Sequence, residues 1–176
     1  MPTRLCHPKA DEALRQAFRT RIAEHEAAGR PIIYLDESGF AADMPRTHGY
    51  ALRGRRCFGK RDWHAKGRVN VLGALLAGGL LTVGLTVCNV DAELFNLWLG
   101  HDLIPKLPPG AVLVMDNATF HKRGDTREMI ENAGHSLEYL PPYSPDLNPI
   151  EPKWAQAKAI RRRTGQSPEE IFSETF

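Results

Sequence analysis

Three carboxylates stand at points of the chain where metal-dependent chemistry can be built. Asp36 follows the apolar run of residues 32–35, Asp116 follows the apolar run of residues 111–115, and Glu151 ends the loop Leu-Pro-Pro-Tyr-Ser-Pro-Asp-Leu-Asn-Pro-Ile-Glu. Hard divalent cations such as Mg²⁺ bind a few carboxylate oxygens and keep other positions for water and phosphate. Because the three acids lie on separate elements that can converge, they predict one metal site.

Two of these acids also have a purely structural interpretation. Asp36 can begin a turn, and it is followed at once by Glu37. Neighbouring strand residues point to opposite faces, so only one of this pair can face a site, and periodicity alone does not select it. Asp116 and Asn117 can likewise bond local backbone in a turn. A metal ligand and a turn residue therefore both remain open for each position.

Glu151 presents a conflict between two roles. Asn148 and Pro149 predict a helix that begins with an Asn cap and a proline at its first position. A glutamate at the third position normally folds back onto the cap residue as a capping box. It cannot do this fully and also hold a metal, although the helix dipole favours its ionised form in either role.

The elements that would position these acids alternate between strands and helices. The predicted elements are a helix capped by Asp11 and closed by Gly29, strands at 32–36, 68–77 and 80–87, a helix from Asp91 to before Pro105, a strand at 111–115, a helix at 126–133, a strand at 136–140 and a helix at 149–163. Ser167 begins a further capped helix carrying Ile171 and Phe172. This order predicts an α/β fold, with a mixed five-stranded sheet and helices on both faces.

One uncharged segment approaches the length of a membrane span. Residues 71–88 contain no charged side chain. Gly78 and Gly79 at its middle suit a two-residue turn, and the residues after them alternate between apolar and small or polar types. This pattern favours a β-hairpin over a membrane helix.

Residues 32–163 resemble the DDE-type transposases of the mariner-related bacterial insertion sequences, which share a ribonuclease H-like catalytic domain. The resemblance is carried by Leu-Asp-Glu-Ser-Gly at 35–39, by Met-Asp-Asn-Ala at 115–118 with His121, and most specifically by residues 140–154. It implies a ribonuclease H-like fold over residues 31–176, preceded by a helical lead-in over residues 1–30.

The resemblance also implies the chemistry. Asp36, Asp116 and Glu151 would be the catalytic triad and would bind Mg²⁺ or Mn²⁺, two ions per site, with Asn117 and His121 as active-site support. The expected reaction is cleavage of double-stranded DNA at transposon ends and transfer of the 3′-hydroxyl to target DNA. The alternatives are a ribonuclease H-like nuclease without strand transfer and an inactive DNA-binding remnant.

Basic residues gather in two clusters although the formal net charge is only +2. Such clusters suit phosphate neutralisation, and they are also common on solvated faces. The residues expected to bind DNA are Arg53, Arg55, Arg56, Lys60, Arg61, Lys153, Lys158, Arg161 and Arg162. Trp63 and Trp154 can either stack on bases or belong to the core.

The remaining features bound the cellular setting and the partners. Three cysteines at irregular spacing give neither a zinc pattern nor a disulfide framework. With no apolar signal core after Met1, we expect a cytoplasmic protein without a membrane partner. Relatives in the resembled family carry helix-turn-helix modules before the catalytic domain, so the resemblance implies a separate recognition module. It also implies a homodimer, because synapsis of two DNA ends would favour a dimer. We assign Asp146, the spare acid of the Pro-rich loop, to turn formation.

Overall fold

The computed structural model describes residues 7–42, 53–54, 67–117 and 124–174. Its elements in chain order are α1 (Glu12–Ala27), β1 (Ile32–Ala41), β2 (Arg68–Leu76), β3 (Gly79–Thr86), α2 (Ala92–Trp98), the π-helix η1 (Leu99–Leu103), the 3₁₀ helix η2 (Ile104–Lys106), β4 (Val112–Met115), α3 (Gly124–Asn132), β5 (Ser136–Tyr139), the 3₁₀ helix η4 (Pro145–Leu147), α4 (Glu151–Thr164) and α5 (Pro168–Glu174). Apart from the short helices η1, η2 and η4, this is the strand and helix order expected from the sequence.

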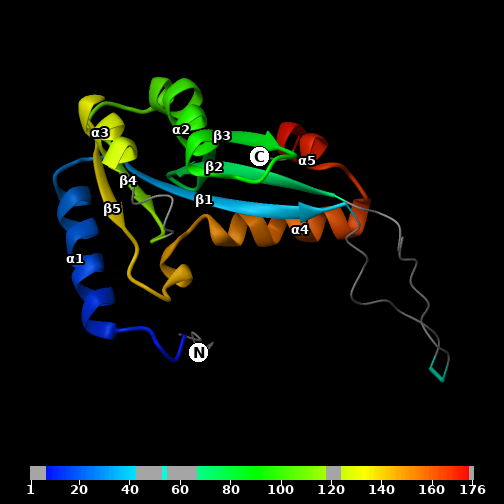
Figure 1. Ribbon diagram of the computed structural model, residues 1–176. Coiled ribbons are helices and arrows are strands. Elements are labelled where there is room, and N and C mark those ends of the chain that lie inside the picture. Colours follow the sequence, from blue (N-terminus) through cyan, green and yellow to red (C-terminus); the bar gives the residue numbers. More distant parts are fainter. Residues whose placement is uncertain (1–6, 43–52, 55–66, 118–123, 175–176) are drawn as a thin grey trace.

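The five strands form one mixed sheet in the order β3-β2-β1-β4-β5 (Figure 1). β1 pairs antiparallel with β2 and parallel with β4, while β4 and β5 are parallel. The sheet therefore changes from antiparallel to parallel pairing at β1. In open α/β sheets such a central position, at the carboxyl ends of parallel strands, is where ligand sites gather.

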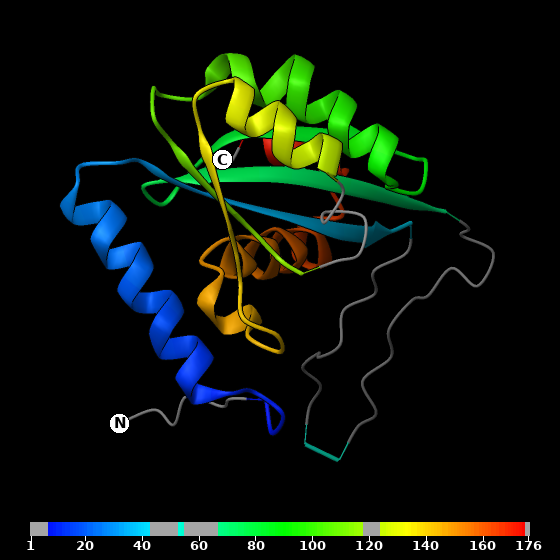
Figure 2. The same ribbon diagram turned by 60° about the vertical axis from the view of Figure 1, so that its left-hand side comes forward.

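Helices cover both faces of this sheet, as Figures 1 and 2 show. On one face, Ile33, Leu35 and Leu113 pack with Phe95 and Trp98 of α2. On the other face, alternate residues of the same strands form two further clusters, one with α4 and α5 and one with α1. Period-two alternation of the strands thus divides the core between two layers of helices.

The β2–β3 hairpin is present, but its turn is displaced from the expected position. Leu76 pairs with Gly79, so the two turn residues are Ala77 and Gly78 rather than Gly78 and Gly79. Both have positive φ, 50° and 85°, as a type I′ turn requires. Gly79 instead begins β3. In the described part of the chain, no helix is long and apolar enough to span a membrane.

Helix ends agree with the sequence at some caps and differ at others. Asp11 caps α1 and Asp91 caps α2 through bonds to backbone N–H groups, as expected. Asn148 does not cap α4, because the helix begins two residues later than predicted, with Ile150 at its N-cap and no side-chain cap bond. The Asn148 side chain instead accepts a bond from the Ile150 N–H and donates one to the Leu35 carbonyl.

An ion pair between the buried Arg15 and the more exposed Asp146 joins α1 to the Pro-rich loop. Arg15 is 1% exposed, and its guanidinium donates to both carboxylate oxygens of Asp146 at 2.8 and 2.7 Å. Asp146 lies in the turn of η4, and the expectation of a turn role alone missed this partner. Phe18 and Ile22 of α1 pack in the same region against Leu140. α1 therefore helps to fix the loop that leads to Glu151.

Removing this carboxylate should be costly for the fold. We expect Asp146→Ala to lower the free energy of unfolding by about 2 kcal/mol, because it removes the bidentate partner of the buried Arg15 and leaves that guanidinium with the more exposed Glu12. Glu131→Ala, which removes the acid of an exposed pair with Arg127, is the matched control and should cost about 0.5 kcal/mol or less. Urea denaturation would measure both free energies of unfolding, provided that the dependence of the free energy on urea concentration is the same for all variants. Equal effects of the two substitutions would contradict a special stabilising role for the Arg15–Asp146 pair.

Candidate active site

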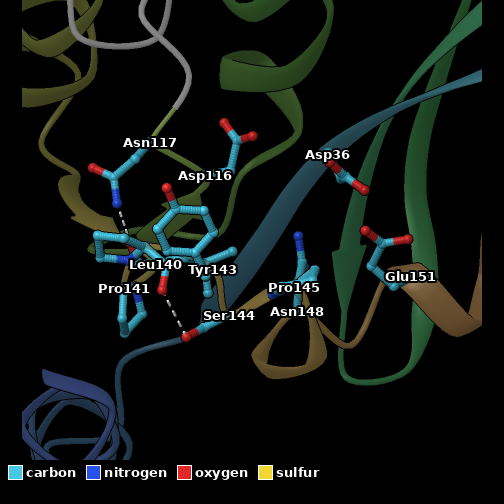
Figure 3. A pocket seen from close by; sticks show the side chains of 11 residues that line it. Asp36, Asp116, Asn117, Leu140, Pro141, Tyr143, Ser144, Pro145, Asn148 and Glu151 are labelled. Carbon is cyan, nitrogen blue, oxygen red and sulfur yellow. Dashed lines mark hydrogen bonds between the residues drawn. The ribbon is translucent and has the colours of Figure 1, made fainter. Parts of the chain in front are cut away.

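The three predicted acids line one pocket. It has a volume of about 240 Å³ and is bounded by β1, by the segment after β4, by the Pro-rich loop and by the start of α4. Asp36, Asp116 and Glu151 all contribute to its wall, and Figure 3 shows Asp36 between the other two in that view. Elements far apart in the sequence thus bring the acids together.

Strand register decides which acid of the Asp36–Glu37 pair faces the pocket. Asp36 lines it, whereas Glu37 is exposed on the other side of β1. Contrary to the sequence expectation, Asp36 is not at the end of its strand, because β1 continues to Ala41. It lies two residues beyond Tyr34, which pairs with Val114 of β4, and so stands level with Asp116. Two neighbouring strands therefore present carboxylates at the same height.

Trp154 of α4 is hydrogen-bonded to Asp36. Its indole Nε1 donates to Asp36 Oδ2 at 2.9 Å, and its side chain is 2% exposed. Trp154 is therefore a core residue and not the exposed base-stacking residue that was one of its two sequence interpretations. Its ring fits only because Gly73, the residue paired with Asp36, has no side chain: a Cβ there would come within 2.4 Å of the Trp154 ring.

The electrostatics of Asp36 are unusual. Burial raises the pKa of Asp36 to about 7, and the negative charges of Glu151 and Asp116 add to this effect. The hydrogen bonds from Trp154 and from the Glu37 backbone act in the opposite direction and stabilise the ionised form. Three carboxylates around one pocket therefore leave a negative charge that the protein itself compensates incompletely.

This shift predicts a pH dependence of stability. The folded state holds the Asp36 proton more tightly than the unfolded state, whose pKa is near 3.8, so the free energy of unfolding should fall as pH rises from about 4 to about 7. Asp36→Asn removes the titrating group and should stabilise the metal-free protein above pH 7 by a few kcal/mol. Chemical denaturation of the wild type and of Asp36→Asn in the presence of a chelator, at pH 5 and at pH 8, measures this difference in stability. The prediction fails if the stability difference between variant and wild type is the same at both pH values.

The pocket suits a hard divalent cation on two grounds. Its donors are carboxylate oxygens, the ligands preferred by Mg²⁺ and Mn²⁺, and the raised pKa of Asp36 marks an unmet demand for positive charge. Among the described residues, however, no group of three His, Cys, Asp or Glu side chains is close enough to enclose an ion. The acids thus share a pocket without forming a closed cage.

Glu151 is placed for the pocket rather than for capping. It is the first residue of α4 and is exposed, and the cap position of that helix is held by Ile150 without a side-chain bond. A capping box would require Glu151 at the third helical position, and the structure places it at the first, so the capping-box interpretation is wrong. A carboxylate in the first turn remains favoured by the helix dipole.

The predicted supporting residues are only partly within the described chain. Asn117 lines the pocket, and its Nδ2 donates to the Leu140 carbonyl, which ties the segment after β4 to the Pro-rich loop. Figure 3 shows this bond. His121 lies outside the described residues, as does Trp63.

The predicted DNA-binding residues occupy different environments. Arg161 donates to the carbonyls of Ala41 and Ala42 at 2.9 and 3.0 Å, so it stabilises the end of β1. Lys158 lies over the Phe40 ring at 5.6 Å. Lys153 and Arg162 are half-buried on α4, and Arg53 is exposed. Four further candidates lie outside the described residues: Arg55, Arg56, Lys60 and Arg61.

Comparisons with known proteins identify the family of this chain and solved structures of similar fold. A family model described as DDE superfamily endonuclease matches residues 31–171. The solved Mos1 transposase paired-end complex with the left transposon end is similar in structure, with a TM-score of 0.69 and 18% identity over 92% of this chain and 52% of that one. The mariner Mos1 paired-end complex with Mg has a TM-score of 0.70 and 19% identity, and the match covers 98% of this chain and 56% of that one.

The catalytic domain of Mos1 mariner transposase solved alone is also similar. Its TM-score is 0.60, with 16% identity over 98% of this chain and 81% of that one. At these identities the likeness shows the fold, which is ribonuclease H-like as expected from the sequence. The chain spans about half the length of the Mos1 transposase chains in the paired-end complexes. A search of curated proteins found no match.

Proposed function

We propose, from the premise that this chain belongs to the DDE superfamily of endonucleases, that it is the catalytic domain of a transposase. It would cut DNA strands with the help of divalent metal ions and join the resulting 3′-hydroxyl ends to target DNA. The observation that carries this proposal is the meeting of Asp36, Asp116 and Glu151 at one pocket.

The three carboxylates would hold Mg²⁺ or Mn²⁺, two ions per site. When bound, such ions activate the attacking oxygen and stabilise the leaving oxygen of an in-line phosphoryl transfer. The protein's own part is to hold the acids in place: Trp154 orients Asp36, and Asn117 ties the segment that carries Asp116 to the Pro-rich loop. Because the pocket is negatively charged, it would repel a DNA phosphate unless cations are bound there.

Cleavage and joining are the same displacement with different attacking groups. In cleavage, the oxygen of a water molecule forms a new bond to phosphorus as the bond to the 3′ oxygen breaks. That oxygen takes up a proton and becomes a 3′-hydroxyl. In joining, the 3′-hydroxyl loses its proton and attacks a phosphorus of the target strand, which releases the target's own 3′ oxygen. No covalent protein intermediate is needed.

The partners follow from the same proposal. Double-stranded DNA, as transposon end and as target, would be the substrate. The Mos1 structures that share this fold include a paired-end complex with the left transposon end and a strand transfer complex. Lys153, Lys158 and Arg162 lie on α4, the helix that begins with Glu151, and would contact phosphates in this proposal. A separate helix-turn-helix module and a homodimer remain part of the proposal.

The deciding experiment follows labelled duplex DNA incubated with the protein in Mg²⁺, Mn²⁺ or EDTA. A second, unlabelled duplex serves as the target. We expect metal-dependent nicks that leave 3′-hydroxyl ends and, when such an end is supplied, covalent joining to the target. Nicking without joining would favour the nuclease alternative, which an RNA–DNA hybrid substrate would then test. DNA binding without cleavage in any metal would favour the inactive remnant.

A further inference from the structure

Tyr143 combines exposure with backbone strain at the edge of the pocket. Its side chain is 53% exposed, and it lines the same pocket as the three acids. Its φ is +56°, a left-handed conformation that costs a non-glycine residue about 1–2 kcal/mol. Among the described residues, Ala77 is the other non-glycine residue with positive φ, and it serves a hairpin turn. Burial in the core does not explain why a large ring stands at this strained position.

The surroundings of the ring resemble a surface for flat aromatic ligands. The His7 imidazole stacks on Tyr143 with ring centroids 4.8 Å apart and planes 11° from parallel. The Lys9 ammonium lies 5.9 Å from the centre of the Tyr143 ring. The Lys9 backbone N–H donates to His7 Nδ1 at 3.1 Å and so fixes the imidazole. A stacked aromatic pair and a cation therefore stand beside a pocket suited to phosphate chemistry.

We propose that Tyr143 and His7 form a stacking site for an unpaired nucleobase of the DNA strand that enters the carboxylate pocket. This inference rests on the proposed function for the identity of the substrate. The base must be unpaired because, within a duplex, neighbouring bases already cover both faces of each base. Lys9 is placed to attract the accompanying phosphate. Because Tyr143 lines the pocket itself, the base would belong to a nucleotide adjoining the reacting phosphate.

The test measures binding and not cleavage, with Ca²⁺, another hard cation that takes oxygen ligands, in place of Mg²⁺ so that a phosphate can enter the pocket. The probes are a single-stranded oligonucleotide that contains 2-aminopurine, whose fluorescence is quenched by stacking, and a duplex of the same sequence. Tyr143→Phe keeps the ring, whereas Tyr143→Gly removes it and relieves the positive φ. We expect Tyr143→Gly to weaken single-strand binding about tenfold, the lower part of the range for one stacked base, and to lose the quenching.

The controls separate stacking from folding and from the proposed function. Tyr143→Phe should bind single strands like wild type, duplex binding should change less than about twofold in both variants, and His7→Ala, outside the loop, should weaken single-strand binding alone. Unchanged single-strand binding by Tyr143→Gly, or an equal loss for duplex and single strand, would overturn the stacking site. Ring-dependent binding by a protein that cuts no DNA in any metal would refute the proposed function and leave the stacking site standing.

Discussion

Asp116→Asn is expected to slow metal-dependent DNA cleavage severely while leaving the fold intact. The substitution keeps the size and shape of the side chain, but it removes the charge and replaces one acceptor oxygen with an N–H donor. Because Asp116 is exposed at the end of β4, its neutralisation should change the free energy of unfolding little. We expect the cleavage rate to fall on the order of 10³-fold, the upper end for loss of one preorganised electrostatic group.

Glu37→Gln is the matched control for this charge removal. Glu37 is an acid of the strand that carries Asp36, but it is exposed on the opposite face of the sheet. Its neutralisation should leave the rate within about twofold, as expected for a surface change away from the site. Wild-type cleavage by Asp116→Asn would return Asp116 to the turn-forming interpretation. An equal loss in both variants would show that net charge, and not position in the pocket, is what matters.

Two of the three acids that line the pocket follow strong local signals in the sequence. Asp116 comes after a fully buried strand, and Glu151 begins a helix after a Pro-rich loop. The choice between Asp36 and Glu37 was different. It depends on the register of β1 with β2 and β4, which is a long-range property that no local period encodes. The resemblance supplied that choice, and the pocket agrees with it.

Contacts between distant segments were beyond sequence reasoning. The ion pair of Arg15 with Asp146 joins residues 131 positions apart, and each residue alone is typical of a solvated surface. The turn at Ala77 and Gly78 was misplaced by one residue because a glycine pair allows either position, and pairing of the strands decides between them. The start of α4 was misplaced because Asn148 bonds to Leu35 of β1.

Gly73→Ala should damage the site through Trp154, which touches no substrate in our proposal and acts as a positioning residue. An added Cβ would lie 2.4 Å from Trp154 Cη2 and 3.2 Å from Ile150 Cδ1, so the indole must move away from Asp36. We expect a loss of about 1–3 kcal/mol in the free energy of unfolding from overpacking. We also expect affinity for Mn²⁺, measured by calorimetry, to fall about 10–100-fold, as for other partners that orient metal ligands.

Gly84→Ala separates the steric effect from the effect on the metal site. A Cβ at Gly84 would meet the ring of Trp98 at 2.8 Å, a similar clash on β3 with a tryptophan of the other helical layer. Gly84→Ala should lower the free energy of unfolding about as much as Gly73→Ala does, and it should leave the affinity for Mn²⁺ unchanged. Trp154→Phe tests the hydrogen bond in the absence of a clash, because it keeps an aromatic ring and removes the N–H group that donates to Asp36. If Trp154→Phe binds Mn²⁺ as tightly as wild type, or if Gly84→Ala weakens binding as much as Gly73→Ala, the indole fills space beneath Asp36 without orienting it.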